Sequence, residues 1–178
     1  MSKIDSGRRA FLRGALLTRS GRKSEVRRQQ PLGPAPPWHR GLPLQQSCVG
    51  CAHPCVSACE TDIIQLHPAD HELAGIPYLD FGRAGCSFCK ACVMTCPLEI
   101  RVDEQHLPSI GTATINRETC IAWDDVICMA CEGRCDYQAI STVHQRRASV
   151  DPERCTGCGN CVSACPVNAI DITRASAD

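Results

Sequence analysis

Short apolar stretches with β-branched residues at alternating positions recur along this chain of 178 residues. They are bounded by Pro, Gly and Asp, which is typical of short strands. Runs such as residues 161–165 suit one or two turns of helix. The pattern therefore predicts small strand, loop, helix, strand units. The predicted strands cover residues 62–66, 78–81, 99–102, 114–116, 139–143, 149–151 and 169–172.

Sixteen cysteines, about 9% of the chain, precede or separate these predicted strands. Aromatic residues make up only 4% of the chain, so an apolar core alone would offset little of the conformational entropy lost on folding. In a reducing compartment, cysteines at this density indicate bound metal rather than disulfides. The cysteines form four groups of four with a period of about 35 residues: Cys48, Cys51, Cys55, Cys59; Cys86, Cys89, Cys92, Cys96; Cys120, Cys128, Cys131, Cys135; and Cys155, Cys158, Cys161, Cys165.

Groups two and four have the spacing C-x-x-C-x-x-C-x-x-x-C-P, which ends at Cys96-Pro97 and at Cys165-Pro166. This is the bacterial ferredoxin spacing for a [4Fe–4S] cluster, in which three cysteines wrap one cluster and the fourth reaches the neighbouring cluster. Structural zinc is the alternative, but its C-x-x-C pairs normally stand about 12–20 residues apart. The spacing therefore predicts [4Fe–4S] clusters in these two groups.

Groups one and three depart from that spacing. Group one has one extra residue between Cys51 and Cys55, and group three has seven residues between Cys120 and Cys128. They are either degenerate repeats without a cluster or further cluster sites, so we expect at least two clusters and four if all groups are filled. If neighbouring groups pair, the ligand sets are Cys48, Cys51, Cys55 with Cys96; Cys86, Cys89, Cys92 with Cys59; Cys120, Cys128, Cys131 with Cys165; and Cys155, Cys158, Cys161 with Cys135.

The pattern predicts an α+β protein built of tandem bacterial-ferredoxin-like modules, with a small core that its [4Fe–4S] clusters stabilise. We expect a basic arm at 1–28, a Pro-rich linker at 29–46 that acts as a semi-rigid spacer, and two-cluster modules at 47–104 and 105–178. Residues 1–40 have a formal charge of +8 and the remaining residues −8. The basic arm has no interleaved aromatic platform, which disfavours nucleic acid as a partner.

Arg8 and Arg9 begin a segment similar to the twin-arginine export motif, but Arg13 interrupts the apolar stretch that should follow. Export needs an apolar region of about 7–15 residues and a cleavage site. We therefore expect a cytoplasmic protein with an uncleaved N-terminus. We expect no membrane span, because no stretch approaches the roughly 20 apolar residues required.

Two other side chains near the cysteine groups invite interpretation. His53 lies inside the first group, where it could hydrogen-bond a cluster sulfur or act as a ligand. Trp123 is expected to shield a cluster face from solvent. Because the chain has no Gly-rich phosphate loop and no nucleophile elbow, we expect no catalytic residue and no enzyme activity.

The chain resembles the NapF family, ferredoxin-type accessory proteins encoded with periplasmic nitrate reductases. The resemblance lies in the start at residues 6–12, in Pro37-Trp38, in the third group from Cys120-Ile121-Ala122-Trp123 to Cys131, and in residues 86–92. It implies a cytoplasmic iron–sulfur protein that helps to mature the molybdenum-containing catalytic subunit of the reductase before export. The immature subunit would be its partner. The alternative is a polyferredoxin that transfers electrons between other redox proteins.

Overall fold

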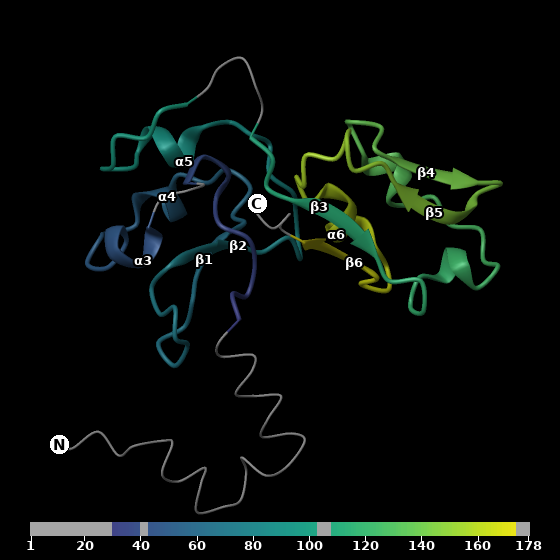
Figure 1. Ribbon diagram of the computed structural model, residues 1–178, viewed down its shortest axis with the longest axis horizontal. Helices are drawn as coiled ribbons and strands as arrows, with labels where there is room; N and C mark the ends of the chain where they lie inside the picture. Colours follow the sequence, from purple (N-terminus) through teal and green to yellow (C-terminus); the bar gives the residue numbers. More distant parts are fainter. Residues whose placement is uncertain (1–29, 40–42, 103–107, 174–178) are drawn as a thin grey trace, which may run out of the picture.

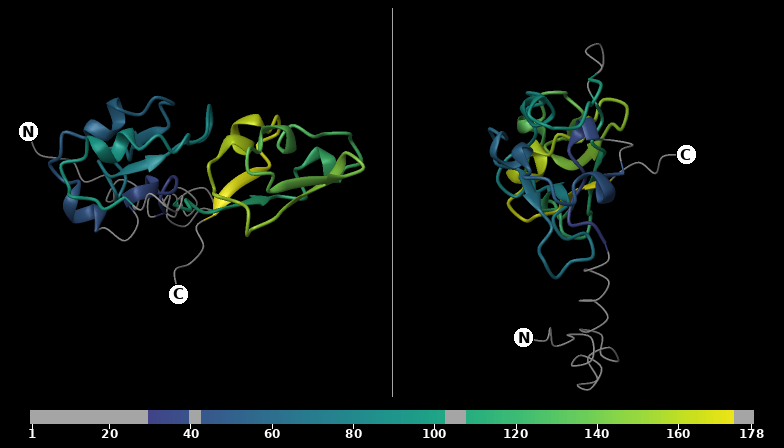
Figure 2. Two further views of the ribbon diagram at one scale, coloured as in Figure 1. Left: turned by 90° about the horizontal axis from the view of Figure 1, so that it is seen from above. Right: turned by 90° about the vertical axis from the view of Figure 1, so that its left-hand side faces the viewer.

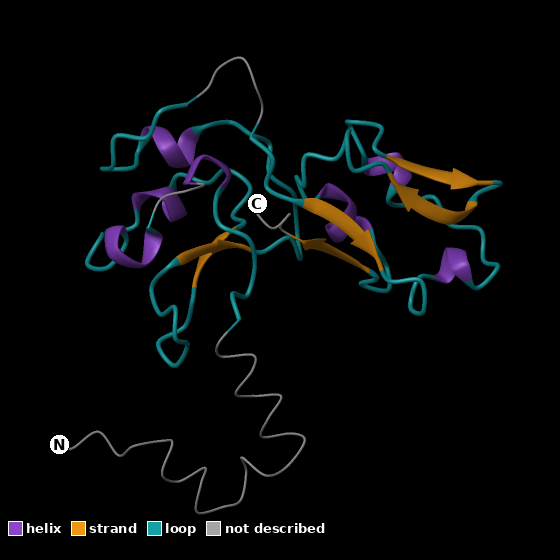
Figure 3. Ribbon diagram, in the orientation of Figure 1, coloured by secondary structure: helices purple, strands orange, loops and turns teal. Residues whose placement is uncertain are grey.

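A computed structural model describes residues 30–39, 43–102 and 108–173. The chain forms two lobes that lie side by side, a first lobe at 30–102 and a second lobe at 108–173 (Figures 1 and 2). Short helices and two-stranded sheets alternate with long loops in both lobes (Figure 3). This confirms the predicted α+β fold of tandem ferredoxin-like units. In the described ranges no helix has both the length and the apolar character needed to cross a membrane.

The second lobe has an approximate internal two-fold arrangement. One strand precedes and one follows each of its cysteine groups, and the outer strands β3 and β6 pair antiparallel while β4 and β5 form a hairpin. This joins the start of the lobe to its end. Its elements are β3 (Thr112–Ile115), η3 (Ile121–Trp123), η4 (Glu132–Arg134), β4 (Ile140–Val143), β5 (Arg146–Val150), α6 (Asn160–Ala164) and β6 (Ile170–Thr173).

The first lobe contains only half of that arrangement. Strands β1 and β2 form the hairpin between groups one and two, with Ile64 opposite Leu79. The strand predicted at 99–102 is wrong, because this segment is not in a strand. A strand at 99–102 would need a partner strand before group one, and the chain there instead forms the helix α3. The elements are η2 (Pro37–His39), α3 (Leu44–Ser47), α4 (Pro54–Ser57), β1 (Ile64–Leu66), β2 (Pro77–Leu79) and α5 (Ala91–Met94).

The expectation of a semi-rigid spacer is also corrected, because the described part of this segment packs against the first lobe. Pro36, Trp38 and His39 are buried, and the Leu79 N–H donates a hydrogen bond to the Pro34 carbonyl at 2.8 Å. This segment therefore lies along β2 as part of the fold. The predicted basic arm at 1–28 lies outside the described residues.

The apolar core is small and consists of two clusters. The first has the larger side chains, among them Trp38, Ile63, Leu79, Phe81 and Phe88. The second is built mostly of small or β-branched residues such as Ala113 and Ile140. Buried cysteines belong to both clusters, so part of each cysteine group lies in the core.

Candidate iron–sulfur sites

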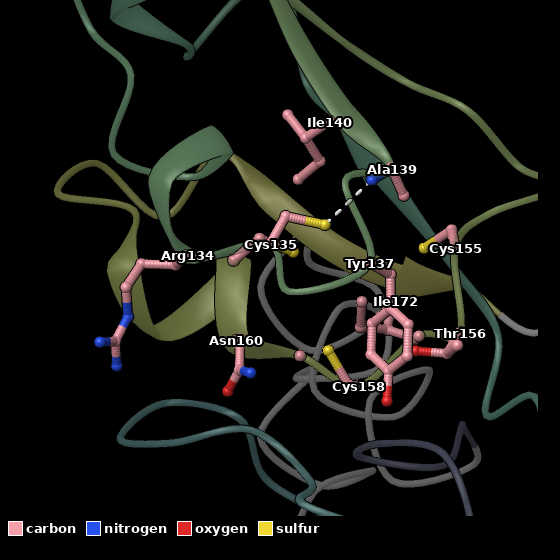
Figure 4. Close-up of a pocket in the computed structure, with 13 residues that line it drawn as sticks. Arg134, Cys135, Tyr137, Ala139, Ile140, Cys155, Thr156, Cys158, Asn160 and Ile172 are labelled. Carbon is pink, nitrogen blue, oxygen red and sulfur yellow. Dashed lines mark hydrogen bonds between the residues drawn. The ribbon is translucent and has the colours of Figure 1, made fainter. Parts of the chain in front are cut away.

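One cysteine set of the second lobe surrounds a cavity with about 300 Å³ of empty space, including its open mouth. Cys155, Cys158 and Cys161 come from group four, and Cys135 from group three reaches the same cavity (Figure 4). Tyr137 also lines it. We name this set site four.

The complementary set surrounds a second cavity in the same lobe, with about 330 Å³ of empty space. Cys120, Cys128 and Cys131 of group three line it together with Cys165 of group four, and this set is site three. The seven-residue insertion of group three therefore does not separate Cys120 from the other cysteines. Part of the insertion forms η3, whose residues Ile121 and Ala122 line the cavity.

Site two lies in the first lobe around a cavity with about 310 Å³ of empty space. Its cysteines are Cys86, Cys89 and Cys92 of group two with Cys59 of group one. Trp38 also lines this cavity, although it stands in the segment expected to be a spacer.

The remaining thiols, those of Cys48, Cys51, Cys55 and Cys96, gather as site one. Burial and the nearby Cys51 and Cys96 thiols raise the pKa of Cys48. Burial, followed by the nearby Cys48, Cys96 and Cys51 thiols, raises the pKa of Cys55 to about 11. The structure thus brings together all four crossed sets expected from the spacing. Their ligation of clusters remains a prediction.

A shared turn explains how three of the groups bring their cysteines together. The residue that precedes α4, α5 or α6 is His53, Lys90 or Gly159, with φ of 51°, 64° and 84°. This left-handed residue reverses the loop, so that the third cysteine of the group becomes the second residue of the helix. The extra residue of group one is accommodated before that turn. His53 occupies the turn itself.

Backbone amides donate to the cysteine sulfurs at equivalent places. The N–H groups of Ala139 and Ala169 each lie 3.2 Å from the sulfur four residues earlier, on Cys135 and Cys165 (Figure 4 shows the first). Amide donors stabilise thiolate and lower the pKa of a thiol. At Cys59, where burial acts in the opposite direction, hydrogen bonds from the Thr61 hydroxyl and from backbone amides lower the pKa.

The third cysteine of each group is the most strongly perturbed. Burial is the main cause, and neighbouring cysteines contribute: the pKa rises to about 11 for Cys55 and Cys131 and to about 12 for Cys92 and Cys161. These thiols are protonated near neutral pH in the free protein. Because a bound metal centre takes cysteine as thiolate, these sites would release protons when they bind it.

The donor sets fit a polynuclear cluster better than a single zinc ion. Zinc requires four ligands within about 2.3 Å of one atom. Among the described residues, no three His, Cys, Asp or Glu side chains converge in that way. Four thiols that surround a cavity, and do not converge on one point, instead suit a polynuclear [4Fe–4S] cluster.

The expectation for Trp123 is wrong, whereas nothing contradicts that for His53. Trp123 does not line the site three cavity; its indole N–H donates to the Ala148 carbonyl at 3.1 Å and Arg117 covers its ring at 4.3 Å. It anchors the insertion to β5. The aromatic residue that shields a site is Trp38, and nothing in the sequence around it signals this role. His53 donates its backbone N–H to Cys51 Sγ at 3.4 Å, and its Nε2 is buried without a partner among the described residues.

Comparison with known proteins identifies iron–sulfur domains in this chain. Residues 47–100 match the 4Fe-4S dicluster domain, and residues 148–171 match the 4Fe-4S binding domain. The ferredoxin-type protein NapF of Escherichia coli is 30% identical over 175 residues, with 94% of each chain covered. That of Haemophilus influenzae is 33% identical over 168 residues, covering 92% of this chain and 91% of the relative. The methylamine utilization ferredoxin-type protein MauM of Methylobacillus flagellatus is 28% identical over 138 residues, covering 68% and 58%.

The chain therefore carries [4Fe–4S] clusters, at least two of them. The two matched domains include cysteine groups one, two and four. Identity of 30–33% over more than nine tenths of each chain shows that it belongs to the NapF family of ferredoxin-type proteins.

Proposed function

We propose that the protein is a cytoplasmic iron–sulfur accessory protein that assists maturation of the molybdenum-containing catalytic subunit of periplasmic nitrate reductase before export. Its membership of the NapF family carries this proposal. The immature catalytic subunit is its partner, and its role is binding without catalysis. The cavities described above support this, because each is lined by four cysteines and mostly apolar side chains.

In this proposal sites one to four each hold a [4Fe–4S] cluster, and the two-cluster modules span 47–104 and 105–178. The clusters would supply one-electron redox chemistry when bound. The protein's own residues hold them as thiolates, donate backbone N–H groups to the sulfurs and exclude water with Trp38 and Tyr137.

A deletion strain separates maturation from electron supply. After deletion of the gene, we expect a reductase depleted in iron and molybdenum, which is inactive even with the artificial donor reduced methyl viologen. A plasmid copy should restore its metal content. A fully metallated reductase with normal viologen activity in the deletion strain would contradict the proposal.

Electron transfer between redox proteins is the second candidate. The observation that favours it is the short distance between two cysteine sets of different lobes, where the Cys86 N–H donates to the Cys158 carbonyl at 2.7 Å. For this function the same deletion should leave a complete reductase that is active with viologen but receives no electrons from its physiological donor. The metal content of the reductase thus distinguishes the two functions.

The basic arm offers a specific test of partner binding. Residues 1–40 have a charge of +8 and resemble an export signal at Arg8 and Arg9, so we propose that the arm competes for the surface that holds the precursor's own signal region. Deletion of residues 1–28 should weaken co-purification with the immature subunit and leave the iron content unchanged. If the truncated protein captures the precursor as well as the full chain does, the lobes and not the arm bind it.

A further inference from the structure

The contact between the two lobes passes directly through two candidate ligands. Cys86 belongs to site two in the first lobe, and Cys158 belongs to site four in the second lobe. The Cys86 N–H donates a hydrogen bond to the Cys158 carbonyl at 2.7 Å. Sites two and four are therefore connected by one main-chain hydrogen bond between residues of the two sets.

Glycines allow this close approach. A Cβ on Gly85 would lie 2.6 Å from the Asn160 nitrogen and 2.7 Å from the Cys158 oxygen. A Cβ on Gly159 would lie 2.6 Å from Cε1 of Phe81 in the first lobe. Since real Cβ atoms do not approach backbone atoms so closely, any other residue at Gly85 must move the lobes apart.

Aromatic rings exclude water beside the junction. Phe88 of the first lobe packs edge-on against Tyr137 of the second, with ring centroids 6.4 Å apart, and Trp38 packs edge-on against Phe88 at 6.1 Å. Trp38 lines site two and Tyr137 lines site four. Cys158 belongs to the same buried core cluster as Phe88, so this core extends across both lobes.

Each of sites two and four also has a neighbouring site within its own lobe. In the first lobe Cys55 of site one and Cys92 of site two lie in the same buried core cluster, and their helices α4 and α5 are in contact. In the second lobe Cys131 of site three and Cys161 of site four share the other core cluster, and η4 is in contact with α6. Site one is thus adjacent to site two, and site three is adjacent to site four.

We infer that the two lobes form one continuous array in which the sites follow one another in the order one, two, four, three, joined at its centre by Cys86 and Cys158. This order differs from the order of the cysteine groups in the chain. The inference goes beyond the proposed function and rests only on the ligand sets. Its tests use purified protein, so they are independent of the deletion strain.

Amide exchange in the unaltered, cluster-loaded protein tests the junction first. The Cys86 amide donates to an acceptor in the other lobe, so it should exchange at least about 100-fold more slowly than an unstructured amide. Hydrogen–deuterium exchange with fragmentation to single residues measures this rate. Free exchange at Cys86 would show that the lobes separate in solution and would overturn the inference.

A matched pair of glycine variants tests the coupling of the sites. Gly85→Ala forces the junction apart, whereas the Cβ of Gly133→Ala meets nothing within 4 Å. Both should keep the iron and acid-labile sulfide content of the parent. After reduction with photoreduced deazaflavin, pulsed EPR should show weaker magnetic coupling between clusters in Gly85→Ala only, together with at least about tenfold faster exchange at Cys86. Equal coupling and exchange in all three proteins would overturn the inference.

Discussion

The backbone N–H of Leu32 donates a hydrogen bond to Nε2 of His67, 3.2 Å away, across 35 residues of sequence. The opposite nitrogen of this ring, Nδ1, donates to the Ile76 carbonyl at 2.6 Å, so the buried imidazole is neutral. His71 accepts from the Leu73 N–H and donates to the Gln30 carbonyl at 2.9 Å. Two buried neutral histidines thus fasten the start of the described chain to the first lobe.

This contact predicts that acid destabilises the first lobe. Burial, with a smaller contribution from His71, lowers the pKa of His67 below 6.5, so the unfolded chain takes up a proton before the folded one does. The free energy of unfolding should therefore reach its full value above about pH 6.5. It should fall as the pH decreases toward the pKa of His67 in the folded protein. Chemical denaturation of the cluster-loaded protein between pH 7.5 and 5.5 measures this dependence.

His67→Phe should reduce the pH dependence, because it removes the titrating group while it keeps a ring in the site. His144→Ala serves as the control, since His144 is exposed in the turn between β4 and β5. If His144→Ala removes as much of the pH dependence as His67→Phe, the histidine contact is not its cause.

The crossed sets predict which cluster each fourth cysteine serves. Cys165→Ser should disturb site three, and Cys135→Ser should disturb site four, because each side chain lines the cavity of the opposite group. Iron analysis and EPR of the reduced variants follow the two sites. Damage confined to the group that contains the substituted cysteine would refute the crossed arrangement.

Four filled sites predict about sixteen iron atoms and sixteen sulfides for each chain after anaerobic purification. A protein with an empty site three would contain about twelve. In air, iron should be lost first from the irregular groups one and three. Colourless protein that contains zinc and no labile sulfide after anaerobic preparation is the result that excludes this prediction.

Trp38 is expected to protect site two and to stabilise the first lobe. It is buried, lines the site two cavity and packs on Phe88, so Trp38→Ala should lower the free energy of unfolding by about 3–5 kcal/mol. Iron should also leave site two faster in air. The matched variant is Trp123→Ala, which removes the contact to Ala148 in β5 and leaves site two intact. Equal loss of iron from site two in both variants would contradict the assigned role of Trp38.

Much of the local arrangement could be predicted from the sequence. The groups that form sites one to four, the hairpin segments and the turn of helix around Cys161 follow from spacing and from alternation of apolar residues. Such features depend on residues close together in the chain. In groups one, two and four, three cysteines within seven or eight residues, followed by a fourth one helical turn later, leave few ways to arrange the four sulfurs.

Contacts between distant segments could not be predicted in this way. The Pro-rich segment before Trp38 has the composition of a free spacer, and it packs only because β2 and two buried histidines provide its hydrogen-bond partners. The segment 99–102 has a strand pattern but forms no strand, because a strand also requires a partner. Composition, spacing and charge thus determined the chemistry of this protein. Only the tertiary structure decided that Trp38 covers a site and that Cys86 meets Cys158, since both depend on surfaces that exist only after the lobes have folded.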